Sequence, residues 1–251
     1  MTTTIDAGAG TTSIARPPSR TARRTGLAYL GIIATGIFAE FVVRGSLVVA
    51  DDPVATAGNI ARSPGLFGVG IAADVVMVAL DVTVALGLFR LLRHVDRRLA
   101  LAATVLRLVQ GAVIALNLIV LVRALGFADE AVGADGAILP GPAREALDAV
   151  ERHALGYDVG LIAFGLGCLV LGRLLATSGL VSRFLALGMT ATGAVYLAGS
   201  FTAIVAPDLS TAVDPLYVLP LVVELAFAMR LATRGLRPVV VAPAQAASAA
   251  T

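Results

Sequence analysis

The sequence predicts an all-α protein built as a bundle of six membrane-spanning helices. Hydrophobic residues make up 58% of the chain and charged residues 14%, and the mean hydropathy is +0.90. An ordinary soluble domain has about a quarter of its residues charged. Six apolar stretches are each long enough to cross a bilayer as a helix, and segments rich in Gly, Pro or charged residues separate them. The net charge of only +2 gives no reason to expect a nucleic-acid partner.

The six predicted spans follow one another along most of the chain. They cover residues 25–49, 66–89, 99–125, 155–176, 184–206 and 216–233. The first is longer than the apolar region of a signal peptide, so we expect it to be retained as a membrane anchor. The flanking segments 1–24 and 234–251 are rich in small residues, Pro and Arg, and we expect them to be disordered tails. The membrane domain is therefore predicted to cover residues 25–233.

The longest connection, residues 126–154, is acidic and precedes the fourth span. Its second half, residues 142–153, starts with a proline and places Ala146, Leu147 and Val150 on one face of a helix. We expect a short amphipathic helix there, which lies on the outer surface or caps the bundle before the chain enters the membrane.

The arginines predict the orientation of the bundle. All 19 basic residues are Arg, and an even number of spans puts both tails on the same side. The tails and the loops around residues 90–98 and 177–183, together with the span ends beside them, hold 13 of them. The other three loops with their span ends hold 5, and Arg107 lies deep within a span. Cytoplasmic loops carry the excess of positive charge in membrane proteins, so we expect both termini in the cytoplasm.

Polar residues inside the spans are the candidate functional residues, because a charge at bilayer depth needs a partner, a cavity or water. A rise of about 1.5 Å per residue puts Asp81 in the second span and Arg107 in the third at nearly the same depth. We expect these two residues to form a buried ion pair, with Gln110 as hydrogen-bonding support. Such a pair can simply fix the register of two helices, and we favour that structural role for it.

Four more carboxylates fall in or beside four different spans. They are Glu40, Asp74, Asp158 and Glu224. We expect no second membrane-buried Arg to neutralise them. One interpretation is that they hydrogen-bond as neutral acids to Asn117, Tyr157, Ser200 or the backbone. The other is an outward-facing, water-filled pocket in which they, with Asn117 and Tyr157, exchange protons or bind a cation.

A metal site has only one weak candidate. His153 precedes Asp158 by five residues, and together with neighbouring acids the two could bind a divalent metal at the outer mouth. We favour an exposed histidine at the end of a surface helix instead. The nucleotide-binding, zinc-protease and serine-hydrolase motifs of common soluble enzymes do not occur in the sequence, and we expect no cofactor.

Short motifs that contain these same residues are spread over Arg24 to Arg234. They include Phe38-Ala39-Glu40, Ala72-Ala73-Asp74 with Asp81, Leu106-Arg107 with Gln110 and Asn117, Gly156-Tyr157-Asp158, and Leu219-Pro220 with Glu224. In combination they resemble the bacterial membrane family called domain of unknown function 4386. The resemblance implies a six-span integral protein of a bacterial inner or plasma membrane, with no assigned activity.

Three hypotheses for the function follow. The first, which we favour, is a small carrier or a proton- or cation-linked transport protein. The second is an intramembrane, metal-dependent enzyme that acts on a lipid-like substrate, and the third is a sensor or structural partner whose charges only hold the bundle together. We expect the lipid bilayer as the immediate partner and an unknown small molecule, ion or lipid as the ligand. A homo-oligomer is compatible with the sequence.

Overall fold

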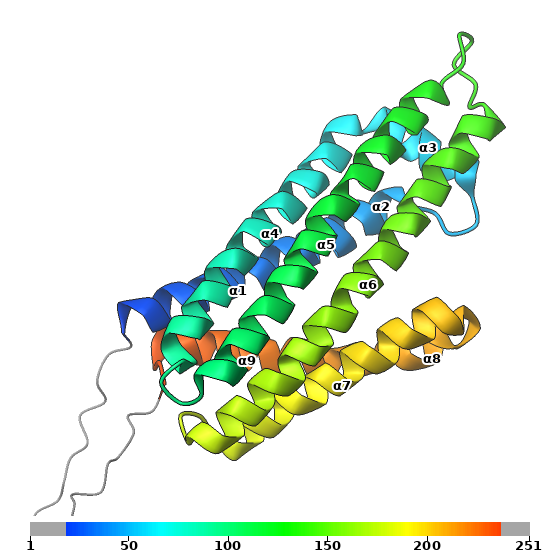
Figure 1. Cartoon of the computed structure of the whole chain (residues 1–251). Coiled ribbons are helices and arrows are strands. Elements are labelled where there is room, and N and C mark those ends of the chain that lie inside the picture. The colour runs from blue at the N-terminus through cyan, green and yellow to red at the C-terminus, as the bar shows by residue number, and fades with distance from the viewer. Residues whose placement is uncertain (1–18, 237–251) are drawn as a thin grey trace, which may run out of the picture.

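The computed structural model describes residues 19–236, and within them the chain is all α-helical with six long apolar helices (Figure 1). The helices are α1 (Arg20–Ile37), continued by a π-helical segment (Phe38–Arg44) and α2 (Gly45–Leu47), then α3 (Pro53–Arg62), α4 (Pro64–Leu92), α5 (Arg97–Glu130), α6 (Pro140–Ser178), α7 (Arg183–Val205), α8 (Ser210–Val213) and α9 (Val218–Thr233). Each of the six long helices has the length and apolarity needed to cross a membrane. The protein is therefore a multi-pass membrane protein in contact with the lipid bilayer.

The separate amphipathic helix expected before the fourth span is not present. Residues 142–153 form the first turns of α6, which is one continuous helix of 39 residues. Their apolar face is buried as the pattern predicts, at Ala146, Leu147 and Val150 among others. The chain has no Gly or Pro between Pro142 and Gly156, so nothing interrupts the helix at the expected boundary. At about 1.5 Å per residue α6 is far longer than the hydrocarbon core, and it extends with its neighbour α5 beyond the shorter α7 and α9 (Figure 1).

The first span also begins earlier than predicted. The helix starts at Arg20 rather than at residue 25, because the Ser19 hydroxyl accepts a hydrogen bond of 3.1 Å from the Ala22 amide and caps it. The parts of the predicted tails at residues 1–18 and 237–251 lie outside the described residues.

The six long helices form a closed ring in which each contacts its two neighbours. Around the ring the order is α1, α4, α5, α6, α7 and α9, and α9 then contacts α1. We call the end that holds Arg20 and Thr233 the near end, and the end that holds α3 the far end (Figure 1). Both ends of the described chain lie at the near end, as expected for six spans.

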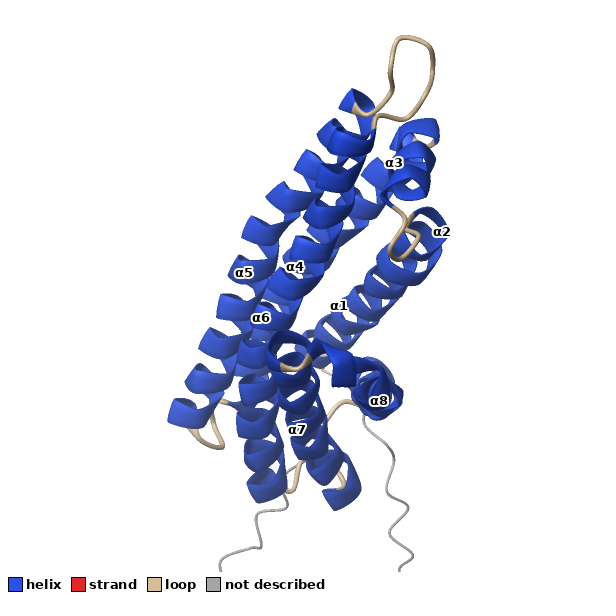
Figure 2. Ribbon diagram, turned by 90° about the vertical axis from the view of Figure 1, so that its right-hand side faces the viewer, coloured by secondary structure: helices blue, strands red, loops and turns tan. Residues whose placement is uncertain are grey.

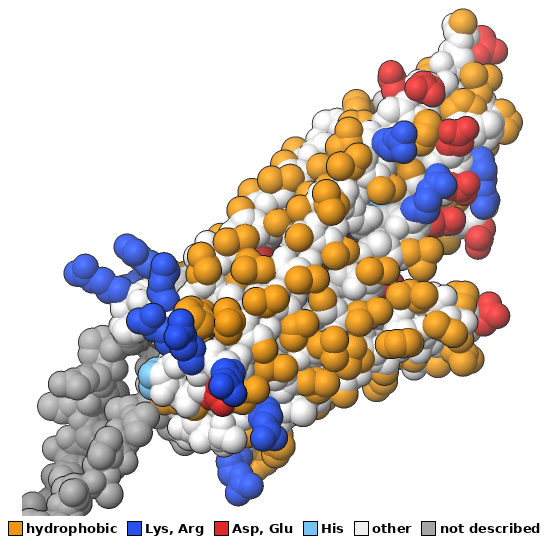
Figure 3. Space-filling view, in the orientation of Figure 1, with side chains coloured by type: hydrophobic (Ala, Val, Ile, Leu, Met, Phe, Trp, Pro, Cys, Tyr) orange, Lys and Arg blue, Asp and Glu red, His pale blue; other side chains and the backbone are white. Residues whose placement is uncertain are grey.

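Glycines allow neighbouring helices of the ring to make close backbone contact at the near end. A Cβ on Gly26 of α1 would collide with the backbone of Ala232 in α9. A Cβ on Gly172 of α6 would lie 2.7 Å from the amide nitrogen of Thr190 in α7. Toward the far end α7 and α9 diverge from α6 and α1 (Figures 1 and 2), and a hollow separates them on the molecular surface (Figure 3).

The surface is divided as expected for a membrane protein. Apolar side chains cover the middle of the face seen in Figure 3, and Arg, Asp and Glu side chains gather at its two ends. Large apolar side chains such as Phe184 are highly exposed in the absence of lipid, at 89%. The membrane in which the protein resides and its orientation remain predictions from the sequence.

Candidate functional site

A buried ion pair joins α4 to α5 at the centre of the ring. Arg107 Nη2 lies 2.6 Å from Asp81 Oδ1, so the pair inferred from helical depth is formed. The Arg107 guanidinium also lies between two aromatic rings, 4.7 Å from the ring centre of Tyr29 and 4.8 Å from that of Phe164. A cation is attracted to an aromatic face, so two further helices help to hold this charge inside the bundle.

A second buried carboxylate is bound by two tyrosines. Glu224 of α9 is 6% exposed and accepts hydrogen bonds from Tyr29 of α1 at 2.7 Å and from Tyr196 of α7 at 2.6 Å. Neither tyrosine was predicted from the sequence to be a site residue. Glu224 itself was the available signal, because a buried carboxylate without a nearby base must find hydrogen-bond donors elsewhere.

These two groups border a central cavity of about 170 Å³. Its polar lining consists of Asp81, Arg107, Gln110, Tyr157, Tyr196, Tyr217 and Glu224. Apolar residues such as Ile33 of α1 and Leu221 of α9 complete its wall. The cavity therefore lies inside the ring and receives residues from all six of the long helices.

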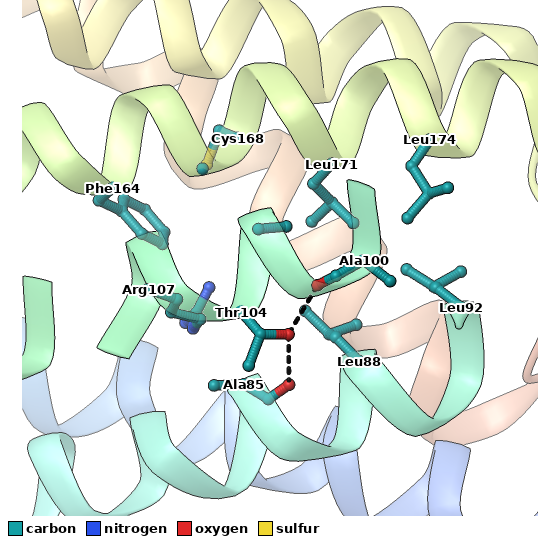
Figure 4. A pocket seen from close by; sticks show the side chains of 12 residues that line it. Ala85, Leu88, Leu92, Ala100, Thr104, Arg107, Phe164, Cys168, Leu171 and Leu174 are labelled. Atoms are coloured by element: carbon teal, nitrogen blue, oxygen red, sulfur yellow. Dashed lines mark hydrogen bonds between the residues drawn. The ribbon is translucent and has the colours of Figure 1, made fainter. Parts of the chain in front are cut away.

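A smaller cavity of about 20 Å³, enough for one water molecule, lies on the near side of the ion pair. Arg107 and Phe164 line both cavities and stand at one end of the smaller one (Figure 4). Leu171 and Cys168 of α6 and Thr104 of α5 also line it, and the Thr104 hydroxyl donates a bond of 2.8 Å to the Ala100 carbonyl. The Arg107 guanidinium therefore lies between the larger, polar cavity and this smaller, mainly apolar one.

A separate polar cluster occupies the far half of the ring. Arg44 Nη1 lies 2.7 Å from Asp74 Oδ2, and Arg44 Nε lies 2.7 Å from Glu40 Oε2. The assumption that no second buried Arg neutralises the carboxylates is therefore wrong. The cause is the π-helical segment Phe38–Arg44, whose wider turns change the direction of the side chains that follow. It turns Arg44 toward Asp74 of α4, so that Arg44 is buried inside the bundle.

The six residues predicted to share one acidic pocket are divided among separate sites. Of the six, Tyr157 and Glu224 line the central cavity. Glu40 and Asp74 bind Arg44, and the Glu40 side chain is 61% exposed. The Asn117 amide donates to the His153 carbonyl at 2.7 Å, and Asp158 Oδ1 accepts from the Ser200 hydroxyl at 3.2 Å.

One protein family matches a segment of the chain that includes almost the whole ring. A family described as Domain of unknown function (DUF4386) matches residues 24–235. The chain belongs to the DUF4386 family. No curated protein and no solved structure matches the chain. The matched range of this DUF4386 protein contains the central cavity, the far polar cluster and the six long helices except the first turn of α1.

The metal site considered for His153 and Asp158 is not assembled in the DUF4386 protein. His153 Nδ1 lies 3.0 Å from the Asn117 side-chain amide, whereas Asp158 is directed to Ser200 on α7. Five residues along a helix place two side chains on different faces, which explains the separation. Within residues 19–236 no three His, Cys, Asp or Glu side chains lie together in a way that could hold a metal ion.

Gln110 of the DUF4386 protein lies one turn from Arg107 on α5 and lines the same cavity. Gln110 Oε1 has no hydrogen-bond partner among the described residues, and the role of Gln110 as hydrogen-bonding support stays a prediction. Asp81 Oδ2 is also buried without a hydrogen-bond partner there. The central cavity is therefore bordered by polar atoms whose hydrogen-bonding capacity is unused within this part of the chain.

Proposed function

We propose that this DUF4386 protein is a small carrier in which Glu224 exchanges a proton for a cation at the central cavity. The observation that carries the proposal is the position of Glu224, a buried carboxylate that lines a cavity of about 170 Å³ inside six membrane spans. A carboxylate within a membrane bundle is costly and is typical of ion and proton pathways.

The surrounding hydroxyls suit both protonation states of Glu224. The ionised carboxylate accepts hydrogen bonds from Tyr29 and Tyr196. The protonated acid can donate to one of the same hydroxyls, since a tyrosine oxygen also accepts. The site therefore loses little hydrogen bonding when a proton binds or leaves.

Because the neighbouring ion pair is neutral overall, the protonation state of Glu224 sets the net charge of the cavity. The charges of Asp81 and Arg107 cancel each other at 2.6 Å. The cavity thus carries one net negative charge when Glu224 is ionised and none when it is protonated. A bound monovalent cation balances the first state, so cation and proton compete for the same charge.

Two irregular helices border the cavity and support a role in transport. The first span changes to a π-helix at Phe38, immediately after the lining residue Ile37. The sixth span begins as the 3₁₀ turn Asp214–Tyr217 and becomes an α-helix at Val218, shortly before Glu224. Broken helices beside a midplane site are characteristic of carriers, in which the irregular segment lines the route of the ion.

The test is proton flux into proteoliposomes that contain the purified full chain, with an imposed pH gradient and membrane potential. We expect flux in the wild type and its reduction to the level of protein-free liposomes in Glu224→Gln. Glu145→Gln is the matched control, because Glu145 is exposed on the first turns of α6. Equal flux in Glu224→Gln and the wild type contradicts the proposal, as does a wild type without flux both with and without added organic or inorganic cations.

A further inference from the structure

Two residues that line the central cavity each carry a buried acceptor atom without a hydrogen-bond donor. Asp81 Oδ2 and Gln110 Oε1 belong to residues that are 5% and 8% exposed, and neither atom has a hydrogen-bond partner within the described chain. Buried polar atoms are nearly always paired with protein, water or a ligand. These two atoms therefore indicate where a molecule in the cavity donates hydrogen bonds.

Several other polar atoms of the cavity are already engaged. Asp81 Oδ1 binds Arg107, and the two oxygens of Glu224 accept from Tyr29 and Tyr196. Arg107 Nε is a single unpartnered donor beside these two unpartnered acceptors. The unused capacity of the cavity is thus mainly that of an acceptor, which a ligand with N–H groups matches.

Aromatic rings form much of the remaining wall. Tyr196 packs edge-on between Phe164 and Tyr217, with ring centres 5.2 Å and 5.7 Å apart, and Tyr157 lines the cavity from α6. Aromatic rings favour an organic cation both through their faces and through apolar contact. Two carboxylates against one guanidinium give the same preference for positive charge.

We propose that the central cavity binds a small protonated amine. Its N–H groups donate to Asp81 Oδ2 and Gln110 Oε1, and its apolar part lies against the tyrosines. A cavity of about 170 Å³ equals the volume of about six water molecules, which limits the ligand to a small compound. This inference names the substrate class of the proposed carrier and rests on that function, with the amine as the cation that competes with the proton at Glu224.

Gly111 offers a substitution that narrows this site and leaves its charges unchanged. A Cβ on Gly111 would lie 3.7 Å from Asp81 Oδ2, an ordinary contact that occupies the space where the amine donates. Ala is a better helix former than Gly, so Gly111→Ala is expected to fold. Gly68→Ala on α4 is the matched control, because a Cβ there meets nothing within 4 Å.

The experiment is calorimetric titration of the detergent-purified full chain with phenethylamine. Its trimethylated analogue keeps the ring and the charge but has no N–H group, and phenylacetate keeps the ring with the opposite charge. We expect phenethylamine to bind the wild type and Gly68→Ala, and to bind Gly111→Ala and Gln110→Met several-fold more weakly at unchanged unfolding temperature. The trimethylated analogue should bind more weakly than phenethylamine, and phenylacetate should not bind.

Three results overturn the inference: no binding of phenethylamine, equal binding of its trimethylated analogue, or full affinity in both folded cavity variants. The two proposals also fail separately. If proton flux depends on Glu224 but no amine binds, the carrier proposal stands and the amine proposal is wrong. If Gly111→Ala weakens amine binding but an amine gradient drives no proton flux, the amine-site proposal stands and the carrier proposal is wrong.

Discussion

The hydroxyl of Tyr29 donates a hydrogen bond of 2.7 Å to Oε2 of Glu224 and thereby joins the first membrane span to the last. The same ring covers one face of the Arg107 guanidinium, 4.7 Å from its centre. One side chain on α1 thus contacts both charged groups of the central cavity, and its removal affects the closure of the helical ring.

Tyr29→Phe should therefore lower the free energy of unfolding by about 1–3 kcal/mol, the usual cost of a buried acceptor without its donor. Denaturant unfolding in micelles measures the change. Tyr157→Phe also removes a tyrosine oxygen, but the partner of that hydroxyl is Met77 Sδ at 4.0 Å. This substitution should lower the free energy of unfolding much less. Equal losses in the two variants would argue against a structural role for the bond to Glu224.

Asp81→Asn should destabilise the protein by about 3–5 kcal/mol, because it leaves Arg107 buried without its counter-ion. The charge swap Asp81→Arg with Arg107→Asp should recover part of the loss. Recovery should be incomplete, since an Arg at position 81 does not lie between Tyr29 and Phe164. If the swapped variant is as unstable as Asp81→Asn, the pairing of the two charges does not stabilise the fold.

The far cluster permits a comparison of two acids that bind one arginine. Asp74→Asn removes a buried partner of Arg44 and should cost about 3 kcal/mol or more. Glu40→Gln removes a partner whose side chain is 61% exposed and should cost about 1 kcal/mol or less. Thermal unfolding of both variants at one pH and salt concentration decides the order, and the reverse order contradicts the assigned burial.

The orientation inferred from the arginines can be tested with cysteine labelling. The single cysteine, Cys168, is buried, so Cys168→Ala provides a suitable background. Ala134→Cys lies in the exposed loop at the far end, and His94→Cys in the exposed turn between α4 and α5. A membrane-impermeant maleimide added to intact cells should label position 134, and should label position 94 only after the cells are opened. The opposite pattern reverses the predicted topology.

Regular helices account for what could be predicted from the sequence. Apolar length placed the six spans, and a constant rise per residue was sufficient to pair Asp81 with Arg107, because both lie in uninterrupted α-helices. The pairing of Arg44 was missed because the π-helix at Phe38–Arg44 departs from that constant geometry. No propensity scale marks where a helix takes an extra residue per turn.

The partners of Glu224 were missed for a different reason. Tyr29 and Tyr196 are separated from it by 195 and 28 residues, and tyrosine is also common at membrane interfaces. Their role depends on which helices are neighbours in the ring. Six spans allow many ring orders, and hydropathy does not choose among them.

The glycine contacts at the near end hold neighbouring helices backbone against backbone. At Gly26 and Gly172 the backbones of α1 and α9, and of α6 and α7, touch without side chains between them. A movement of α7 away from α6 that widens the hollow at the far end must break the hydrogen bond between Ser200 and Asp158. A passage toward the near end requires the helix backbones themselves to separate at Gly26 and Gly172.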